Sequence, residues 1–138
     1  KFGTDTAAAN ALDDYEQGTF TPSLTDGTTS VSLGTQYYEK VGRLVSIYIS
    51  AYNQDFSSLS TTGNLQITGL PFTVAVSAPC AFASNSPNGK ILAVHPGGTA
   101  TYIWITDAGA VDYSHGTKAT IGLGTGNASV RGQFNYLA

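Results

Sequence analysis

The sequence has little charge of either sign. Only 11% of its 138 residues are charged, against about a quarter in ordinary soluble proteins, and its six lysines and arginines are scattered. No basic run is present that would neutralise several neighbouring phosphates, so we expect no nucleic-acid partner. No stretch approaches the roughly 18 apolar residues that a membrane-spanning helix needs, so we expect no membrane insertion.

Cysteine and methionine are almost absent. The one cysteine, Cys80, cannot form an internal disulfide, and its apolar neighbours predict a small buried side chain rather than a reactive thiol. The sequence contains no methionine, even at position 1, and no secretory signal. We therefore expect a fragment or a processed product whose fold does not depend on disulfides.

Serine, threonine, glycine and tyrosine take the place of the missing charges. The chain has 18 Thr, 13 Ser, 16 Gly and 8 Tyr, a composition typical of β-rich proteins with neutral surfaces rather than of helical bundles. A chain of this length forms one domain and buries a full core without metal or disulfide support. We expect a single domain over residues 12–138, preceded at 1–11 by an arm or linker without a strand period.

The clearest strand signal covers residues 43–52. Its apolar side chains alternate between two faces: Val45, Ile47, Ile49 and Ala51 on the first, and Leu44, Tyr48 and Tyr52 on the second. A strand that is aliphatic on one face and aromatic on the other is buried on both sides, or it meets a partner chain.

Other short strand signals recur along the chain with turn residues between them. We expect strands at 19–25, 36–40, 63–70, 72–77, 81–84, 90–95, 99–106, around 111 and at 129–136. Pro22 cannot donate to a β-ladder, so the strand at 19–25 should lie at a sheet edge or begin at a bulge. Many short strands with neither a helical period nor an internal repeat predict an all-β fold, an antiparallel β-sandwich or jelly roll.

The densest group of acids is Asp13, Asp14 and Glu16. Neighbouring residues of an extended segment point to alternate faces, so we favour capping of backbone amides or pairing with Lys40 or Arg43 over a calcium site. Single acids such as Asp26 lie in turns, where aspartate usually bonds its own backbone. Two acids from separate loops could still meet in space as a hydrolytic pair.

Other catalytic and metal signals are weak. The two histidines, His95 and His115, lack a third ligand at a metal-binding spacing. The glycine-rich run at 122–126 has neither the lysine nor the strand-to-helix context of a phosphate loop. We expect no catalytic residue, no metal and no cofactor.

Aromatic residues give the better indication of a binding site. Tyr102 and Trp104 lie two residues apart on one face of an expected strand, and Tyr113 and His115 follow in the next turn. Flat aromatic faces beside neutral polar groups suit sugar rings, which offer C–H patches and hydroxyls. The alternative, which we favour from the residues alone, is that Tyr102 and Trp104 fill a core or a subunit interface.

Three segments in the first half of the chain, in the same order, resemble segments of bacteriophage tail proteins. Residues 10–22 resemble the pattern Asn-Thr-Leu-Asp-Asp-Tyr-Glu-Glu-Gly-Thr-Trp/Phe-Thr-Pro and depart from it at Ala11 and Gln17. Residues 38–45 are similar to the Tyr-x-Lys-Ile/Val-Gly-Arg/Asn-x-Val segment. Residues 60–72 resemble the Ser-Thr-Gly-x-x-x-Ile-Ser-Gly-Leu-Pro-Phe corner. The second half, from about residue 78, carries no such resemblance.

The resemblance implies a C-terminal domain of a tail fibre, tailspike or tail-needle knob. Such domains are β-sandwiches, often jelly rolls similar to the tumour-necrosis-factor fold, and usually assemble as trimers. The resemblance therefore implies a homotrimer in the extracellular tail of the virion. Its partners would be an upstream fibre or needle shaft and a host-cell surface glycan or other receptor, which it would bind non-covalently.

Residues can be assigned to each role on this interpretation. We expect the trimer interface at Tyr48 and Tyr52, and the ligand site at Trp104, Tyr113 and His115. We expect a structural anchor, where the arm meets the sandwich and Gly18 permits a tight turn, at Asp13, Asp14, Tyr15, Glu16 and Gly18. Two alternatives stay open: a polysaccharide depolymerase using acids such as Asp107 and Asp112, and a purely structural trimerisation cap.

Overall fold

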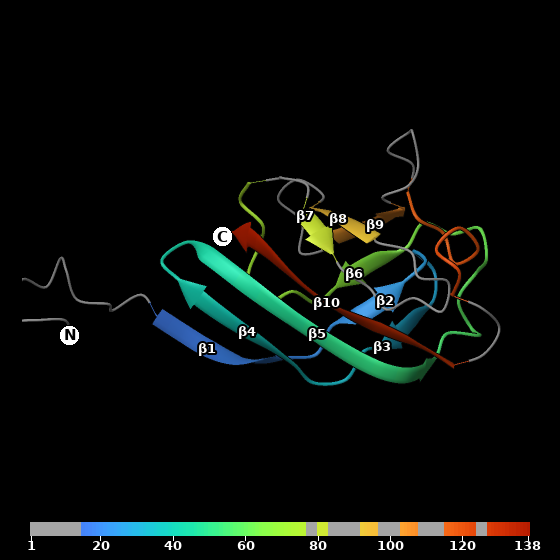
Figure 1. The fold of residues 1–138 in the computed structure, drawn as a ribbon, viewed down its shortest axis with the longest axis horizontal. Helices are drawn as coiled ribbons and strands as arrows, with labels where there is room; N and C mark the ends of the chain where they lie inside the picture. Colours follow the sequence, from blue (N-terminus) through green and yellow to red (C-terminus); the bar gives the residue numbers. More distant parts are fainter. Residues whose placement is uncertain (1–14, 77–79, 83–91, 97–102, 108–114, 124–126) are drawn as a thin grey trace, which may run out of the picture.

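The computed structural model describes residues 15–76, 80–82, 92–96, 103–107, 115–123 and 127–138 (Figure 1). Within these ranges the protein is all-β, and its strands form two antiparallel sheets. The strands are β1 (Tyr15–Phe20), β2 (Ser23–Thr25), β3 (Ser30–Ser32), β4 (Gln36–Val41), β5 (Leu44–Asp55), β6 (Gln66–Thr68), β7 (Cys80–Phe82), β8 (Leu92–Pro96), β9 (Ile103–Asp107) and β10 (Asn127–Leu137).

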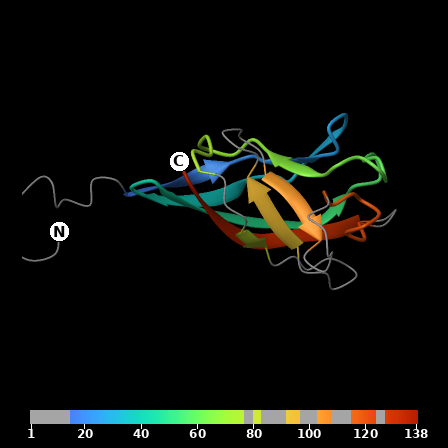
Figure 2. The same cartoon turned by 90° about the horizontal axis from the view of Figure 1, so that it is seen from above.

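One sheet has four strands in the order β1-β4-β5-β10, and the other has six in the order β3-β2-β6-β9-β8-β7. The long strands β4, β5 and β10 run side by side along the domain in both ribbon views (Figures 1 and 2). β4 and β5 are joined by the two-residue turn Gly42-Arg43, in which Gly42 has a positive φ of 57°. A positive φ at the first turn residue matches the twist of the hairpin, and glycine adopts it without steric cost.

The hydrophobic core of the described residues lies where the two sheets meet. The four-stranded sheet contributes the aliphatic face of β5 and one face of β10, and the six-stranded sheet contributes Leu24, Ile67 and Val94. The inward hydrophobic residues of β5 and β10 are Val45, Ile47, Ile49, Ala51, Ala128, Val130, Phe134 and Tyr136. The predicted faces of 43–52 and 129–136 are confirmed. Each large aliphatic side chain buried in this way contributes about 1.5–3 kcal/mol to the free energy of unfolding.

The expected single strand at 19–25 is wrong, because the chain changes sheets in the middle of it. β1 ends at Phe20 in the four-stranded sheet, and β2 begins at Ser23 in the six-stranded sheet. Pro22, which lies between them, has no N–H to continue a ladder, and its carbonyl instead accepts the N–H of Leu33 at 2.9 Å. The proline therefore marks the crossing between layers.

Two other expected strands end differently in the structure. The segment 72–77 does not resume a sheet as far as it is described: Val76 forms one isolated bridge to Leu137, and the amide of Ala75 bonds the Leu137 carbonyl. The strand at 63–70 shortens to β6, with Leu65 and Ile67 fully buried as expected. The expected arm at 1–11 and the strand around 111 lie outside the described residues, as does the side chain of Cys80.

Asp26, which directly follows β2, ties two loops together. One carboxylate oxygen accepts the N–H groups of Thr28 and Thr29, both at 2.7 Å, and the other accepts the N–H of Ser60 at 2.6 Å. The bonds from Ser60 and Thr29 hold the pKa of the Asp26 carboxyl well below its usual value, against the opposing effect of burial. Asp26 does bond its own turn, as expected, but it also fixes a loop 34 residues away.

Lys118 joins a third segment to the same region. Its side chain is buried, and the Nζ atom donates to the carbonyls of Ser57 and Leu59, each at 3.2 Å. Asn64 pairs with Thr117 in an isolated β-bridge. The segments 26–29, 56–64 and 115–123, which we call the distal loops, are thus held together by hydrogen bonds.

Replacing Asp26 by asparagine tests this tie. We expect Asp26→Asn to lower the free energy of unfolding at pH 7 by about 2 kcal/mol, because hydrogen bonds to a charged acceptor are lost or weakened. The lowered pKa of Asp26 means that its contribution is present above the unfolded-state value near about 4 and is lost as the pH falls below it. Urea unfolding of both proteins at pH 7 and pH 3 should show the difference shrinking at pH 3, and an equal difference at both pH values would contradict this account.

Candidate functional site

Residues of the three sequence segments 10–22, 38–45 and 60–72 meet around one tyrosine. The ring of Tyr38 packs edge-on against Phe20, with centroids 6.3 Å apart, and against Phe72 at 5.3 Å. Its hydroxyl donates to the carboxylate of Glu16 at 2.6 Å, which is the largest cause of the raised pKa of Tyr38. Lys40 places its ammonium 5.5 Å from the centre of the Phe72 ring. Residues from all three segments therefore form one contact cluster.

Gly18 serves this cluster in a way that the sequence interpretation missed. The expected tight turn is wrong, because Gly18 lies inside β1, directly opposite Tyr38. A Cβ atom on Gly18 would lie 2.7 Å from the Tyr38 hydroxyl and 2.8 Å from a ring carbon. Glycine is needed here for the close approach of an aromatic ring rather than for a turn.

The corner after β6 is fixed by glycine and by a buried tyrosine. Gly69 has a positive φ of 78°, and a Cβ there would lie 3.2 Å from the carbonyl oxygen of Thr21. The hydroxyl of Tyr136 donates to the Phe72 carbonyl at 3.0 Å and accepts the Phe72 N–H at 3.3 Å. Burial raises the pKa of Tyr136 to about 12. These two hydrogen bonds to the backbone of Phe72 hold its ring against Tyr38.

The face of the four-stranded sheet that points away from the core is unusually apolar, and we call it the outer face. In the ladder register, residues that stand opposite Leu44, Ser46, Tyr48 and Ser50 share this face. All the large hydrophobic side chains that are exposed among the described residues lie on it: Tyr15, Tyr37, Val41, Leu44, Tyr48, Tyr52, Val76 and Leu137. Tyr48 and Tyr52, which the sequence indicated, are joined there by residues of four other segments.

Five of these side chains form one row across the whole sheet. The register places Tyr15 opposite Val41, Val41 opposite Leu44, and Leu44 opposite Leu137, and the isolated bridge adds Val76. Each is between 37% and 49% exposed. We call this set the proximal row, since it lies at the end of the sheet where β1 begins. A continuous apolar strip of this kind is rare on monomeric proteins and typical of contact surfaces.

A shallow hollow of about 400 Å³ lies next to this row on the outer face. It is lined by Gln17, Gly18, Thr19, Tyr37, Tyr38, Glu39 and Tyr48. The Tyr48 hydroxyl donates to the carboxylate of Glu39 at 3.3 Å. Burial, and then the charge of Glu39, raise the pKa of Tyr48. The hollow thus combines aromatic rings with a carboxylate.

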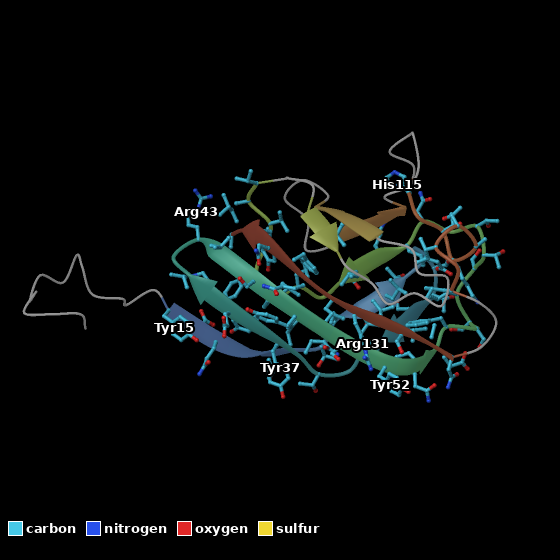
Figure 3. All side chains as sticks on the ribbon, viewed as in Figure 1. Tyr15, Tyr37, Arg43, Tyr52, His115 and Arg131 are labelled. Carbon is cyan, nitrogen blue, oxygen red and sulfur yellow. The ribbon has the colours of Figure 1, made fainter. Side chains whose placement is uncertain are left out.

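Arg131 lies further along the same face. Its guanidinium stacks 4.7 Å from the centre of the Tyr52 ring (Figure 3). Tyr52 comes just before a β-bulge, where Asn53 has a positive φ of 54° and its N–H bonds the hydroxyl of Ser129. The bulge changes the local twist of β5 at the position that pairs the ring with the guanidinium.

The predicted ligand residues are only partly within the described structure. His115 is exposed, at the end of the distal loops, away from the outer face (Figure 3). The backbone of Trp104 lies in β9, opposite Gln66 and His95, whereas its side chain lies outside the description. Tyr113, the acids Asp13, Asp14 and Asp112, and the side chain of Asp107 also lie outside it. His115 and the tyrosines Tyr48 and Tyr52 belong to separate surfaces.

The sequence interpretation missed most members of the outer face. Tyr37 and Glu39 alternate with Tyr38 and Lys40, so the period of two already placed them on one face of β4. The pattern could not show which strand lies beside β4. Tyr37 meets Tyr48 only because of the β4–β5 register.

Comparisons with known proteins leave the family open: no protein-family model matches this chain, and no curated protein is significantly similar to it. Across the described ranges, no group of three or more His, Cys, Asp or Glu side chains is placed to hold a metal ion. The same ranges contain no helix that is long and apolar enough to span a bilayer.

A double-mutant cycle tests the packing of Tyr38 on Gly18. We expect Gly18→Ala to cost about 1–3 kcal/mol of stability, because the added methyl must displace the Tyr38 ring. The same change should cost much less in a Tyr38→Ala background, where the ring is absent. Denaturant unfolding of the four proteins measures the coupling, with Gln17→Ala on the outer face of β1 as the control. Equal costs of Gly18→Ala in both backgrounds would refute the contact.

Proposed function

We propose that this chain is the jelly-roll tip domain of a bacteriophage tail protein, which assembles as a homotrimer through the outer face. The three segments that resemble phage tail proteins support the proposal, and so does their convergence on Tyr38. The observation that carries it is the placing of all the exposed large hydrophobic side chains, among the described residues, on one sheet face.

The outer face has the character of a subunit interface. Large side chains cover it along the length of the sheet, from Tyr15 at one end to Tyr52 at the other (Figure 3). Burying each one against a neighbouring copy contributes roughly 25 cal/mol per Å² of apolar area removed from water. Tyrosine suits such a surface because its ring buries a large area while its hydroxyl still finds a polar partner.

The distal loops are the part of the domain that suits a receptor. They carry exposed hydroxyl and amide groups, among them Thr61, Thr62 and Asn64, and they have His115 at their edge. Asp26 and Lys118 hold the loop backbones in place, which lowers the entropy lost on binding. A neutral and rigid polar surface of this kind suits a host-cell surface glycan, which would be bound non-covalently by many hydrogen bonds.

The interface has a direct test. Light scattering at micromolar concentration should give about three times the chain mass of 14.3 kDa. Leu44→Glu and Tyr48→Glu should each yield a folded monomer, because they place a charge inside the apolar contact. Ser58→Glu, an equal change in the exposed part of the distal loops, should leave the trimer intact. A wild-type monomer, or equal effects of all three changes, would refute this assignment of the interface.

Receptor binding has a separate test on a panel of bacterial lipopolysaccharides and capsular polysaccharides. We expect the trimer to be retained by a subset of the panel. His115→Ala and Trp104→Ala should weaken retention several-fold without changing the oligomeric mass, since one aromatic contact is worth about 1 kcal/mol.

The rival functions predict other results in the same assay. New reducing ends that disappear in Asp107→Asn or Asp112→Asn would favour the depolymerase. Binding to no polymer and to no cells would favour a purely structural trimerisation cap, whose deletion prevents assembly of the fibre.

A further inference from the structure

We infer that the hollow beside Glu39 receives the guanidinium of Arg131 from a neighbouring copy of this chain. The inference rests on the proposed trimer and assigns to it a specific pair of residues and a direction of assembly. It uses two features of the outer face, the acidic aromatic hollow and the stacked arginine, and Arg131 is not among the residues that line the hollow of its own chain.

A threefold assembly needs two different patches that fit each other. In a cyclic trimer the contact runs head to tail, so one surface of each copy meets a different surface of the next. The outer face is divided in this way: the hollow lies over β1 and β4 and extends to Tyr48, whereas Arg131 lies on β10, at the other edge of the sheet. Each copy would therefore give an arginine to one neighbour and receive one from the other.

The hollow has the chemistry of a site for a cation. Tyr37 is 64% exposed, and Tyr48 adds a second ring that stands directly opposite it in the ladder. The carboxylate of Glu39 accepts one hydrogen bond from Tyr48 and keeps further acceptor positions, since a carboxylate can accept about four. The other lining residues, such as Gln17 and Thr19, are neutral. A guanidinium would gain both the attraction of the rings and a charged hydrogen bond.

Arg131 is presented in a form suited to such a partner. Its stacking on Tyr52 engages the flat face of the guanidinium, which leaves the N–H groups at the edges to reach a carboxylate. Among the described residues, no carboxylate accepts a hydrogen bond from Arg131 or forms a salt bridge with it. Arg131 is itself exposed, in line with a role on a contact surface.

The register places the hollow and Arg131 at nearly the same position along the strands, which we call their height. Arg131 stands opposite Ser50, two residues along β5 from Tyr48. Two residues of a strand span about 7 Å, a step that an extended arginine side chain covers. With a threefold axis that runs along the strands, equivalent residues of the three copies lie at the same position along that axis, and Arg131 of one copy then faces the level of the hollow in the next.

A charge exchange tests the pairing in the full chain. Trimer dissociation constants are measured by analytical ultracentrifugation for wild type, Glu39→Arg, Arg131→Glu and the double variant, with circular dichroism as the check of folding. Each single change should weaken the trimer by at least about tenfold, and the double variant should return to within about threefold of wild type. Ser58→Arg serves as the charge control, and Arg131→Gln, which removes the charge without reversing it, should give an intermediate loss.

The outcomes separate this inference from the proposed function. A wild-type trimer with unaffected single variants, or a double variant no tighter than the weaker single one, overturns the pairing and leaves the trimer standing. A wild-type monomer overturns the trimer, and the pairing with it. If Glu39→Arg does not fold, the comparison of Arg131→Glu with Arg131→Gln and Ser58→Arg decides the case, and equal constants for all three refute the pairing.

Discussion

Strands β5 and β10 pair along almost their whole length, from Asp55 opposite Asn127 to Leu44 opposite Leu137. This register decides which side chains enter the core and which form the outer face. A slip of one residue would turn the aliphatic row of β5 to solvent and bury Tyr48 and Tyr52, so the hydrophobic core holds the register strongly. The proximal row and the height of Arg131 relative to the hollow both follow from the same alignment.

The sequence segments 10–22, 38–45 and 60–72 have a shared physical role. Phe20, Tyr38 and Phe72 come from three separate parts of the chain, and they meet as one aromatic cluster. Gly18 makes room for the central ring, and Glu16 accepts its hydroxyl. The residues of these segments are constrained by packing, because they hold separate parts of the chain together. On the proposed function, recognition of a partner falls to other surfaces, the outer face and the distal loops.

Those two surfaces differ in how they are built, which suits two kinds of contact. The outer face presents large rings and aliphatic side chains on a regular ladder, a surface that releases much water when covered. The distal loops present small polar groups on a backbone tied by Asp26 and Lys118. On the proposed function, the apolar surface meets copies of the same chain and the neutral polar surface meets a receptor.

The sequence by itself determined the all-β class, the two faces of β5 and β10, and the place of Tyr48 and Tyr52 on the second face of β5, because side chains alternate along any strand. Only the tertiary structure decided that the chain changes layers at Pro22, that Gly18 makes room for a ring, and that Tyr37, Glu39 and Arg131 share a face with those tyrosines. The physical reason is that strand pairing is non-local. Alternation fixes where a side chain points within its own strand, whereas the neighbour across the ladder comes from a segment such as β10, far along the chain, and is chosen by the packing of the whole core.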